Sequence, residues 1–361
     1  MLVATFSIAM GIMLQSLRAA DGDAGRQVLA LLRWHDALGD NATLVYAKSG
    51  RGRFDPPFRD HPMMTLSKEP SVYDYRFREQ LTFRAQEVTR ERVLESFQIV
   101  QGNPKMQLAP YSKISNRGNR IVDLLVPDAD RPDQPALVND RGKPAVNGDL
   151  ARTMRLKRLA FGLGIAELFA EPPTLERSDE GIVLRGVGAF VPGEEVTVVA
   201  RLDRNLLVRG ITLTPRRPGH GVHYHLEHSG RKCLAGLAFP ERCAVRVYVQ
   251  TVGEHGPTGP ISEDTQFEYT LRDFRRHLTD AEYEQLTSME RATKNAFRFD
   301  HDKKESYQLD DSGHRKLLPP YPSQDRQGWS SFAIWAVVAV HGVAFVTAAL
   351  WIRRRIRTHR I

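Results

Sequence analysis

The chain has 361 residues, two cysteines and a formal net charge of +8. Six of the positive charges are Arg18 and the five arginines that follow residue 352, so the long central part of the chain is nearly neutral. Nucleic-acid binding needs Lys and Arg clustered on one face together with stacking aromatics, and this charge distribution argues against it. The sequence also lacks the Gly-x-Ser-x-Gly, phosphate-loop, His-Glu-x-x-His and Gly-x-Gly-x-x-Gly motifs of common enzyme classes.

The first 20 residues have the features of a secretory signal peptide. An apolar run from Leu2 to Leu14 is followed by the small pair Ala19 and Ala20. Such a run is too short to span a membrane comfortably and matches the apolar region of a signal peptide. Because no Lys or Arg precedes it, an uncleaved anchor is the alternative. Both interpretations predict that residues 21–298 form a domain outside the cytoplasm, either periplasmic or extracellular.

Residues 329–352 are predicted to form a single transmembrane helix. These 24 residues contain no Asp, Glu, Lys or Arg, and that length crosses a hydrocarbon core of about 30 Å. Tryptophans at the two ends and arginines directly after the run predict a cytoplasmic C-terminus. These anchor residues are Trp329, Trp335, Trp351, Arg353, Arg354 and Arg355. The alternative is a buried helix of a soluble core. Residues 299–328 are predicted to be a polar stalk, and residues 353–361 a basic tail.

The N-terminal half of the domain combines helical and strand patterns. Apolar spacing predicts a helix over Ala24–Leu38 and a strand over Thr43–Ala47. From Tyr73 to Ala85 apolar and polar residues alternate, with Glu79 as the one exception on the apolar side, which predicts a long half-buried strand. A helix is the competing interpretation. Residues 101–148 are rich in turn-forming residues and predict one or two strands among long loops.

The C-terminal half is more regular. Leu156–Phe169 is predicted to be a helix, and the locally basic stretch Arg152–Arg158 its solvated face. Six strands of similar length follow between residues 181 and 274, separated by turn residues, which predicts an antiparallel meander. Thr279–Glu282 has the pattern of a capping box and predicts a helix to about Phe297. The expected fold class is α+β, with helices packed on an antiparallel sheet and one C-terminal transmembrane helix.

Four segments of the meander resemble the outer-membrane lipoprotein carrier and sorting proteins. They are the strand pair across a polar turn at Leu202–Val208, the Tyr-x-Leu end Tyr224–Leu226, the proline-led Leu237–Pro240, and the tyrosine-bearing Phe267–Phe274. The resemblance covers residues 21–276 and implies a strongly curved half-barrel whose concave apolar face holds acyl chains or a hydrophobic peptide. This chain departs from the carrier in its additional residues 101–148 and its predicted membrane anchor.

A histidine-rich segment is the best candidate for a chemical site. His223, His225 and Glu227 would share one face of a strand, and His228 follows directly. Two imidazoles and a carboxylate at this spacing suit a zinc ion with one open position. The alternative is a strand with a polar solvent-facing side.

Cys233 and Cys243 are separated by nine residues. In an oxidising compartment they are predicted to form a disulfide, which would contribute about 2 to 3 kcal/mol by restricting the unfolded chain. A redox or zinc pair is disfavoured because those sites use a Cys-x-x-Cys spacing with further ligands.

Three functions remain open from the sequence. The first is a non-catalytic, membrane-anchored binding module for a lipid, a lipoprotein or a hydrophobic partner segment. The second is a metal-dependent enzyme at His220–His228, with zinc as the only cofactor considered. The third is a structural or receptor domain that binds a protein. The expected partners are the membrane and a lipid or lipoprotein, but no nucleic acid, and the oligomeric state is not determined.

Overall fold

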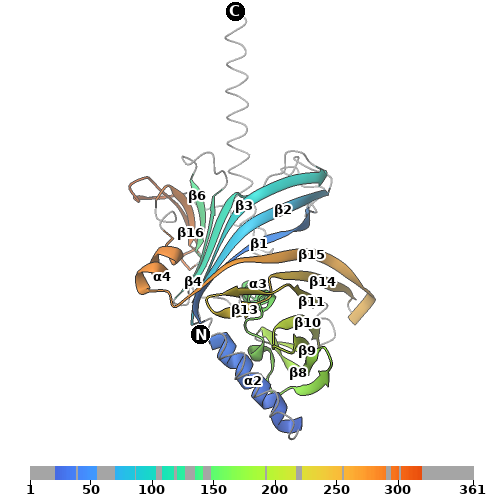
Figure 1. The fold of residues 1–361 in the computed structure, drawn as a ribbon. Coiled ribbons are helices and arrows are strands. Elements are labelled where there is room, and N and C mark those ends of the chain that lie inside the picture. Colours follow the sequence, from blue (N-terminus) through green and yellow to red (C-terminus); the bar gives the residue numbers. More distant parts are fainter. Residues whose placement is uncertain are drawn as a thin grey trace, which may run out of the picture.

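The computed structural model of the protein describes residues 21–37, 40–54, 70–85, 87–102, 108–117, 120–126, 135–140, 148–191, 193–216, 222–253, 256–289, 294–300 and 302–318. One large sheet of sixteen strands dominates this part of the chain (Figure 1). The strand order is β18-β17-β16-β6-β5-β4-β3-β2-β1-β15-β14-β11-β10-β9-β8-β7, and β12 and β13 form a separate small hairpin.

The strands before the second helix are β1 (Asn41–Phe54), β2 (Ser71–Arg84), β3 (Glu87–Gln101), β4 (Tyr111–Arg117), β5 (Arg120–Val126) and β6 (Ala136–Asp140). Those of the meander are β7 (Thr174–Ser178), β8 (Gly181–Val191), β9 (Glu194–Asp203), β10 (Val208–Pro215), β11 (Val222–Ser229), β12 (Lys232–Leu234), β13 (Leu237–Phe239), β14 (Arg242–Gly253) and β15 (Gly256–Arg276). The last three are β16 (Ala296–Asp300), β17 (Glu305–Leu309) and β18 (Arg315–Leu317). The helices are α2 (Asp21–Ala37), α3 (Gly148–Ala160) and α4 (Asp280–Thr287), with a short 3₁₀ turn η1 at Ala166–Leu168.

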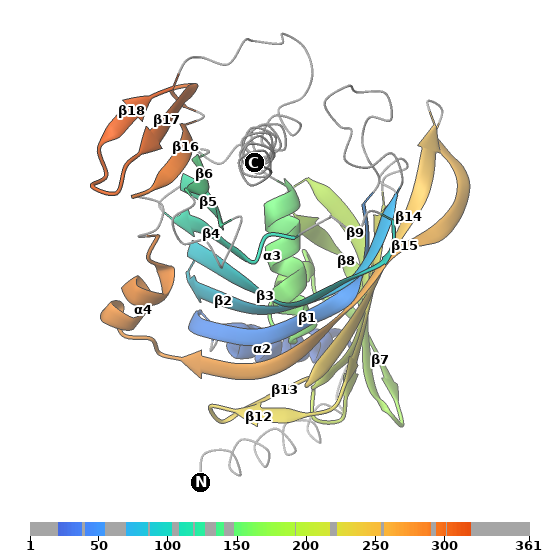
Figure 2. The ribbon, with the colours of Figure 1, turned by 90° about the horizontal axis from the view of Figure 1, so that it is seen from above.

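The sheet is strongly curved, and α3 lies inside the curve (Figure 2). We call the side of the sheet that faces α3 the inner face. Tyr46 on β1 lies on this face, since its ring packs against Phe161, just after α3, with 5.1 Å between ring centroids. The main hydrophobic core fills the space between α2, α3 and the meander, with Leu159, Phe161 and Leu163 fully buried. Burial of apolar side chains from both helices therefore holds the curved sheet in shape.

A second, smaller core lies over β5, β6, β16 and β17. It contains Leu124, Val138 and Tyr307. Here β16 pairs with β6 in parallel, whereas the other paired strands are antiparallel. The carboxylate of Asp140 on β6 binds both Arg120 of β5 and Arg298 of β16. Burial raises the pKa of Asp140, but the two guanidinium groups outweigh it, so the pKa lies below its usual value. An ionised Asp140 thus fastens the parallel strand to the sheet.

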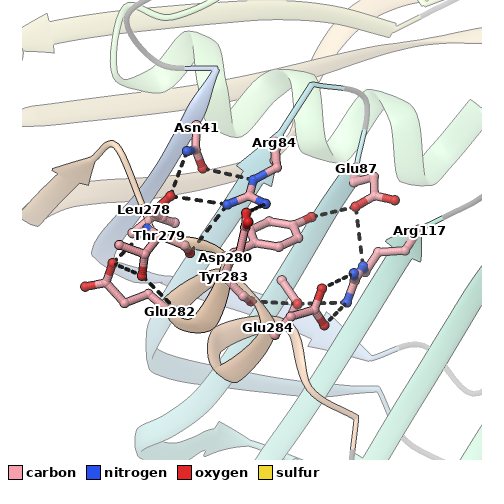
Figure 3. Close-up of polar contacts among 11 residues, drawn as sticks. Asn41, Arg84, Glu87, Arg117, Leu278, Thr279, Asp280, Glu282, Tyr283 and Glu284 are labelled. Carbon is pink, nitrogen blue, oxygen red and sulfur yellow. Dashed lines mark hydrogen bonds and ion pairs between the residues drawn. The ribbon is translucent and has the colours of Figure 1, made fainter.

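Helix α4 is held against the sheet by a network of polar contacts (Figure 3). Its N-terminus has the predicted capping box, in which Thr279 Oγ1 accepts from the backbone N–H of Glu282 and Glu282 Oε2 accepts from that of Thr279. Tyr283 lies between two cations, with Arg84 Cζ 4.1 Å and Arg117 Cζ 5.2 Å from its ring centroid. The Tyr283 hydroxyl donates to Glu87. Because its contacts are mostly polar, α4 adds little to the hydrophobic cores.

The expected fold class is corrected by this architecture. The sequence predicted an α+β half-barrel with packed helices and a transmembrane helix, whereas the structure is mainly one sixteen-stranded mixed sheet with three short helices. The difference arises because residues 111–140 form three strands, and because the helix predicted up to Phe297 ends at Thr287 and is followed by strand β16. Local pattern underestimated these segments: β4, β5 and β6 pair with strands adjacent in the chain, whereas β16 joins the sheet by pairing with the distant β6.

None of the helices in the described part of the chain is both long and apolar enough to cross a membrane. The residues assigned to the signal peptide (1–20), the predicted span (329–352) and the tail (353–361) lie outside the described residues. Trp329, Trp335, Trp351 and Arg353–Arg355 are among them. The first part of the segment expected to form a stalk lies within the sheet: residues 299–318 contain the end of β16 together with β17 and β18, and Tyr307 and Leu309 are buried in the second core.

Candidate functional site

A buried ion pair lies on the inner face between β2 and α3. The side chains of Glu79 and Lys157 are each 2% exposed, and the Lys157 ammonium contacts Glu79 Oε2. The hydroxyl of Tyr46, directly opposite Glu79 on β1, donates to the same oxygen at 2.8 Å. Glu79 is the polar exception in the alternating pattern of β2, and the structure shows why it is tolerated: a buried carboxylate needs a cation and hydrogen-bond donors.

The charge state of Glu79 follows from its surroundings. Burial by itself raises the pKa of Glu79, but the positive charges of Lys157, Arg90 and Lys48 outweigh it, so the pKa falls to about 2. The carboxylate is therefore ionised at neutral pH. Tyr46 and Tyr269 border the pair, and burial followed by the Glu79 charge raises the pKa of both phenols well above the usual value. Both tyrosines stay neutral and act as hydrogen-bond donors or apolar walls.

Cations outnumber carboxylates around Glu79. Lys48, Arg90 and Arg92 lie on the same inner face. Arg92 lies directly opposite Glu79, while Arg90 and Lys48 lie opposite the residues two positions to either side of Glu79 on β2. Burial lowers the pKa of both Lys48 and Arg92. Among the residues that the structure describes, the only other carboxylate on this part of the face is Asp123, in register across β4 with Arg90. With Lys157 included, four cations face two carboxylates.

One of these cations has an unused hydrogen-bonding group, and the other two make few polar contacts with side chains. The Nε atom of Arg90 is buried and has no hydrogen-bond partner in the described part of the chain. Arg92 donates through Nε to Ser112 Oγ at 3.2 Å. Lys48 contacts rings rather than carboxylates, with its Nζ 4.3 Å from the Phe267 centroid and 5.5 Å from that of Tyr75. A buried donor without a partner is costly, so an acidic group from a ligand would gain from these positions.

A row of aromatic side chains continues the inner face beyond the cations. Tyr73, Tyr75 and Phe77 follow one another on β2, with adjacent centroids 6.0 and 5.3 Å apart, and Phe97 on β3 lies 5.5 Å from Tyr73. We call these four residues the aromatic row. Tyr73, Tyr75 and Phe97 are only partly buried, whereas Phe77 is buried. The row thus combines an apolar surface with access from outside the core.

Glycines on β1 make room for this row. Gly52 lies opposite Tyr73 and Gly50 opposite Tyr75. A Cβ atom on Gly52 would lie 2.4 Å from the Tyr73 ring, and one on Gly50 would lie 2.9 Å from Cβ of Phe267. The tyrosine rings therefore lie across the backbone of β1, which only glycine permits at this distance. The arrangement as a whole offers flat apolar contact next to fixed positive charge.

The histidine strand is divided between the two faces of the sheet. His228 lies on the inner face, where it is buried and its Nε2–H donates to the Leu159 carbonyl at 3.0 Å. His223, His225 and Glu227 lie on the opposite face, with 3.7 Å between His225 Nε2 and Glu227 Oε1. His228 therefore cannot join the other three residues in one site. No group of three or more His, Cys, Asp and Glu that suits a metal ion occurs among the described residues, and the zinc site stays a prediction.

The predicted disulfide is not shown. Cys233 and Cys243 are both free thiols in the structure: Cys233 is exposed on β12, and Cys243 is buried on β14. Cys233 lies opposite Ala238 in the small hairpin, while Cys243 lies opposite His228 in the large sheet. The two thiols thus belong to different sheets. Burial raises the pKa of the Cys243 thiol, which keeps it protonated and unreactive.

Sequence reasoning missed the cations of the site. Residues 152–158 were interpreted as the solvated face of a helix, yet Lys157 is buried and Arg155 donates to the carbonyls of Phe190 and Glu167. The available signal was Glu79, because a carboxylate on an otherwise apolar strand face requires a buried cation. The identity of that cation depends on tertiary contacts between β2 and α3, which are 78 positions apart in the chain.

Comparison with known proteins gives little additional information. No family model matches the chain, and none of the curated proteins matches it. One solved structure with some likeness is that of a DUF1329 family protein from Desulfovibrio piger ATCC 29098. It is 10% identical, the match covers 74% of this chain and 99% of the other, and the TM-score is 0.30. This distant structural neighbour carries no argument about activity or ligand.

Proposed function

We propose that the protein is a non-catalytic binding module that holds the acyl chain of a lipid or lipoprotein against the inner face of its sheet. The observation that carries the proposal is the aromatic row, three of whose four members are partly exposed on the face that turns toward α3. Partly exposed aromatic side chains on a concave face are a common feature of sites for apolar ligands. The location outside the cytoplasm predicted from residues 1–20 belongs to the same proposal.

The resemblance to lipoprotein carriers supports the same class of ligand. The resemblance implies a curved sheet that receives acyl chains on its concave side. The inner face of this protein is curved around α3 (Figure 2). Here α3 and the main core fill the part of the inner face next to the meander. The partly exposed surface is the part formed by β1, β2 and β3, so the ligand is expected there.

Binding of a neutral single-chain lipid to the full-length protein tests the proposal. Monopalmitin is a suitable probe because its head group is uncharged, and its affinity would be measured by displacement of a fluorescent acyl probe. We expect saturable binding that weakens about five- to tenfold in Phe97→Ala, since the variant loses the apolar contact of a partly buried ring. Val187→Ala is the control, because Val187 is an exposed apolar residue on β8, and six strands separate β8 from β2 in the strand order of the sheet. Absence of monopalmitin binding, or equal weakening by both variants, would overturn the proposal.

A further inference from the structure

We infer that Lys48, Arg90 and Arg92 form a subsite for the acidic head group of a single-chain lipid whose chain lies on the aromatic row. This inference rests on the proposed function and specifies its ligand. The three cations come from neighbouring parts of β1 and β3, on either side of β2, and share the inner face with the row.

The charge balance on this face favours an anion. Lys157 is matched by Glu79, with which it forms the buried pair. Asp123 on β5 lies near Arg92 and offsets part of the remaining positive charge. At least one further positive charge is left without a matching carboxylate on this part of the inner face, counted over the described residues. Unmatched charge in a partly buried site is unfavourable, and a bound anion would relieve it.

The geometry provides donors as well as charge. The guanidinium of Arg92 is held in place by the hydrogen bond from its Nε to Ser112 Oγ. Arg90 contributes the buried Nε atom that lacks a partner among the described residues. A guanidinium offers two parallel N–H groups to the oxygens of a carboxylate, so two such groups define a binding site for one acidic head group.

The cations and the aromatic row are in direct contact, which favours a ligand that is acidic at one end and apolar at the other. Arg92 Cζ lies 4.5 Å from the Phe77 ring centroid, and Lys48 Nζ lies over Tyr75 and Phe267. A small free anion would use the charges and leave the aromatic rings unused. A fatty-acid carboxylate uses both, so we take a long-chain fatty acid as the occupant.

The experiment compares palmitate with monopalmitin at about pH 8, where the carboxylate is ionised. Both lipids carry the same acyl chain and differ in head-group charge. We expect the full-length protein to bind palmitate at least about tenfold more tightly, and this preference to decrease with added salt. Lys48→Gln, Arg90→Gln and Arg92→Gln should each lower the affinity for palmitate severalfold more than that for monopalmitin. Saturable monopalmitin binding that is retained also reports that the variant is folded.

Two controls sharpen the result. Arg78→Gln changes an exposed arginine on the opposite face of β2, so it should alter neither affinity. Arg92→Lys keeps the charge and should retain part of the preference. Equal binding of the two lipids, or an undiminished preference in all three charge variants, would overturn the inference while leaving the proposed function in place. Inorganic phosphate that binds as tightly as palmitate would overturn it in favour of a free-anion site. Binding of neither lipid would overturn the proposed function as well.

Discussion

Tyr46 and Glu79 face each other directly across β1 and β2, and the Tyr46 hydroxyl donates a hydrogen bond of 2.8 Å to Glu79 Oε2. The same oxygen receives the ammonium group of Lys157 from α3. One carboxylate oxygen therefore joins two strands to the helix inside the curve of the sheet. The positive charges of Lys157, Arg90 and Lys48 are the reason that Glu79 remains ionised in an otherwise apolar setting.

Loss of the Glu79 charge should destabilise the protein strongly. In Glu79→Gln the Lys157 ammonium stays buried without its carboxylate, which costs about 3 to 5 kcal/mol of unfolding free energy. Urea denaturation of the full-length protein measures this. The double variant Glu79→Gln, Lys157→Met removes both charges and should recover a large part of the loss. A double variant as unstable as the single one would contradict the role of the pair, and Arg78→Gln should lie within about 0.5 kcal/mol of the unmodified protein.

His228 should make the protein less stable in acid. Burial lowers the pKa of His228 to about 4, from 6.5 in the unfolded chain, and its contact with the Leu159 carbonyl offsets this only in part. Between these two values the unfolded state binds more protons, so the unfolding free energy rises from pH 4 to 6.5 and is level above. The contribution at pH 4 amounts to at most about 3 kcal/mol.

The variant His228→Gln tests this contribution, because glutamine keeps a donor for Leu159 but does not titrate. Its unfolding free energy, measured by denaturant titration across this pH range, should fall less on acidification than that of the unmodified protein. His35 and Asp36 titrate in the same range, with pKa values of about 4 and 6, and burial is the main cause of both shifts. Both residues are present in the two proteins, so the difference isolates His228. Parallel pH profiles would refute the assignment.

The capping box of α4 should contribute measurably to stability (Figure 3). Thr279→Ala removes the hydroxyl that accepts from the Glu282 N–H, at an expected cost of about 1 kcal/mol. Thr279→Ser keeps the hydroxyl and should be nearly neutral. Thermal unfolding of the two variants checks the expectation, and equal melting temperatures would show that the capping hydroxyl adds nothing to the contacts that hold α4 on the sheet.

The two cysteines should differ in reactivity. Cys233 is exposed and Cys243 is buried, so a maleimide should label one thiol in the folded protein and two after denaturation without reductant. A disulfide, as the sequence predicted for an oxidising compartment, would instead leave both thiols unlabelled until a reductant is added. Mass spectrometry of the labelled chain distinguishes the two results.

Much of the secondary structure was predictable because its cause is local. Alternation of apolar and polar residues predicted β2, and turn residues separated the strands from β8 to β15. The capping box predicted the start of α4, which depends on hydrogen bonds between residues three positions apart. The addition of β16, β17 and β18 to the sheet was not predictable, because the parallel pairing of β16 with β6 joins residues about 160 positions apart.

The sequence by itself determined some of the strands, among them β2 and most of the meander, and that Glu79 is out of place on an apolar face. Only the tertiary structure decided which residues pair with the Glu79 carboxylate. Lys157, Arg90 and Arg92 reach the same inner face through the curvature of the sheet and the position of α3, and no local pattern encodes either. Charge neutralisation and burial depend on distances in space, so the sequence predicts the need for a partner but only the fold supplies it.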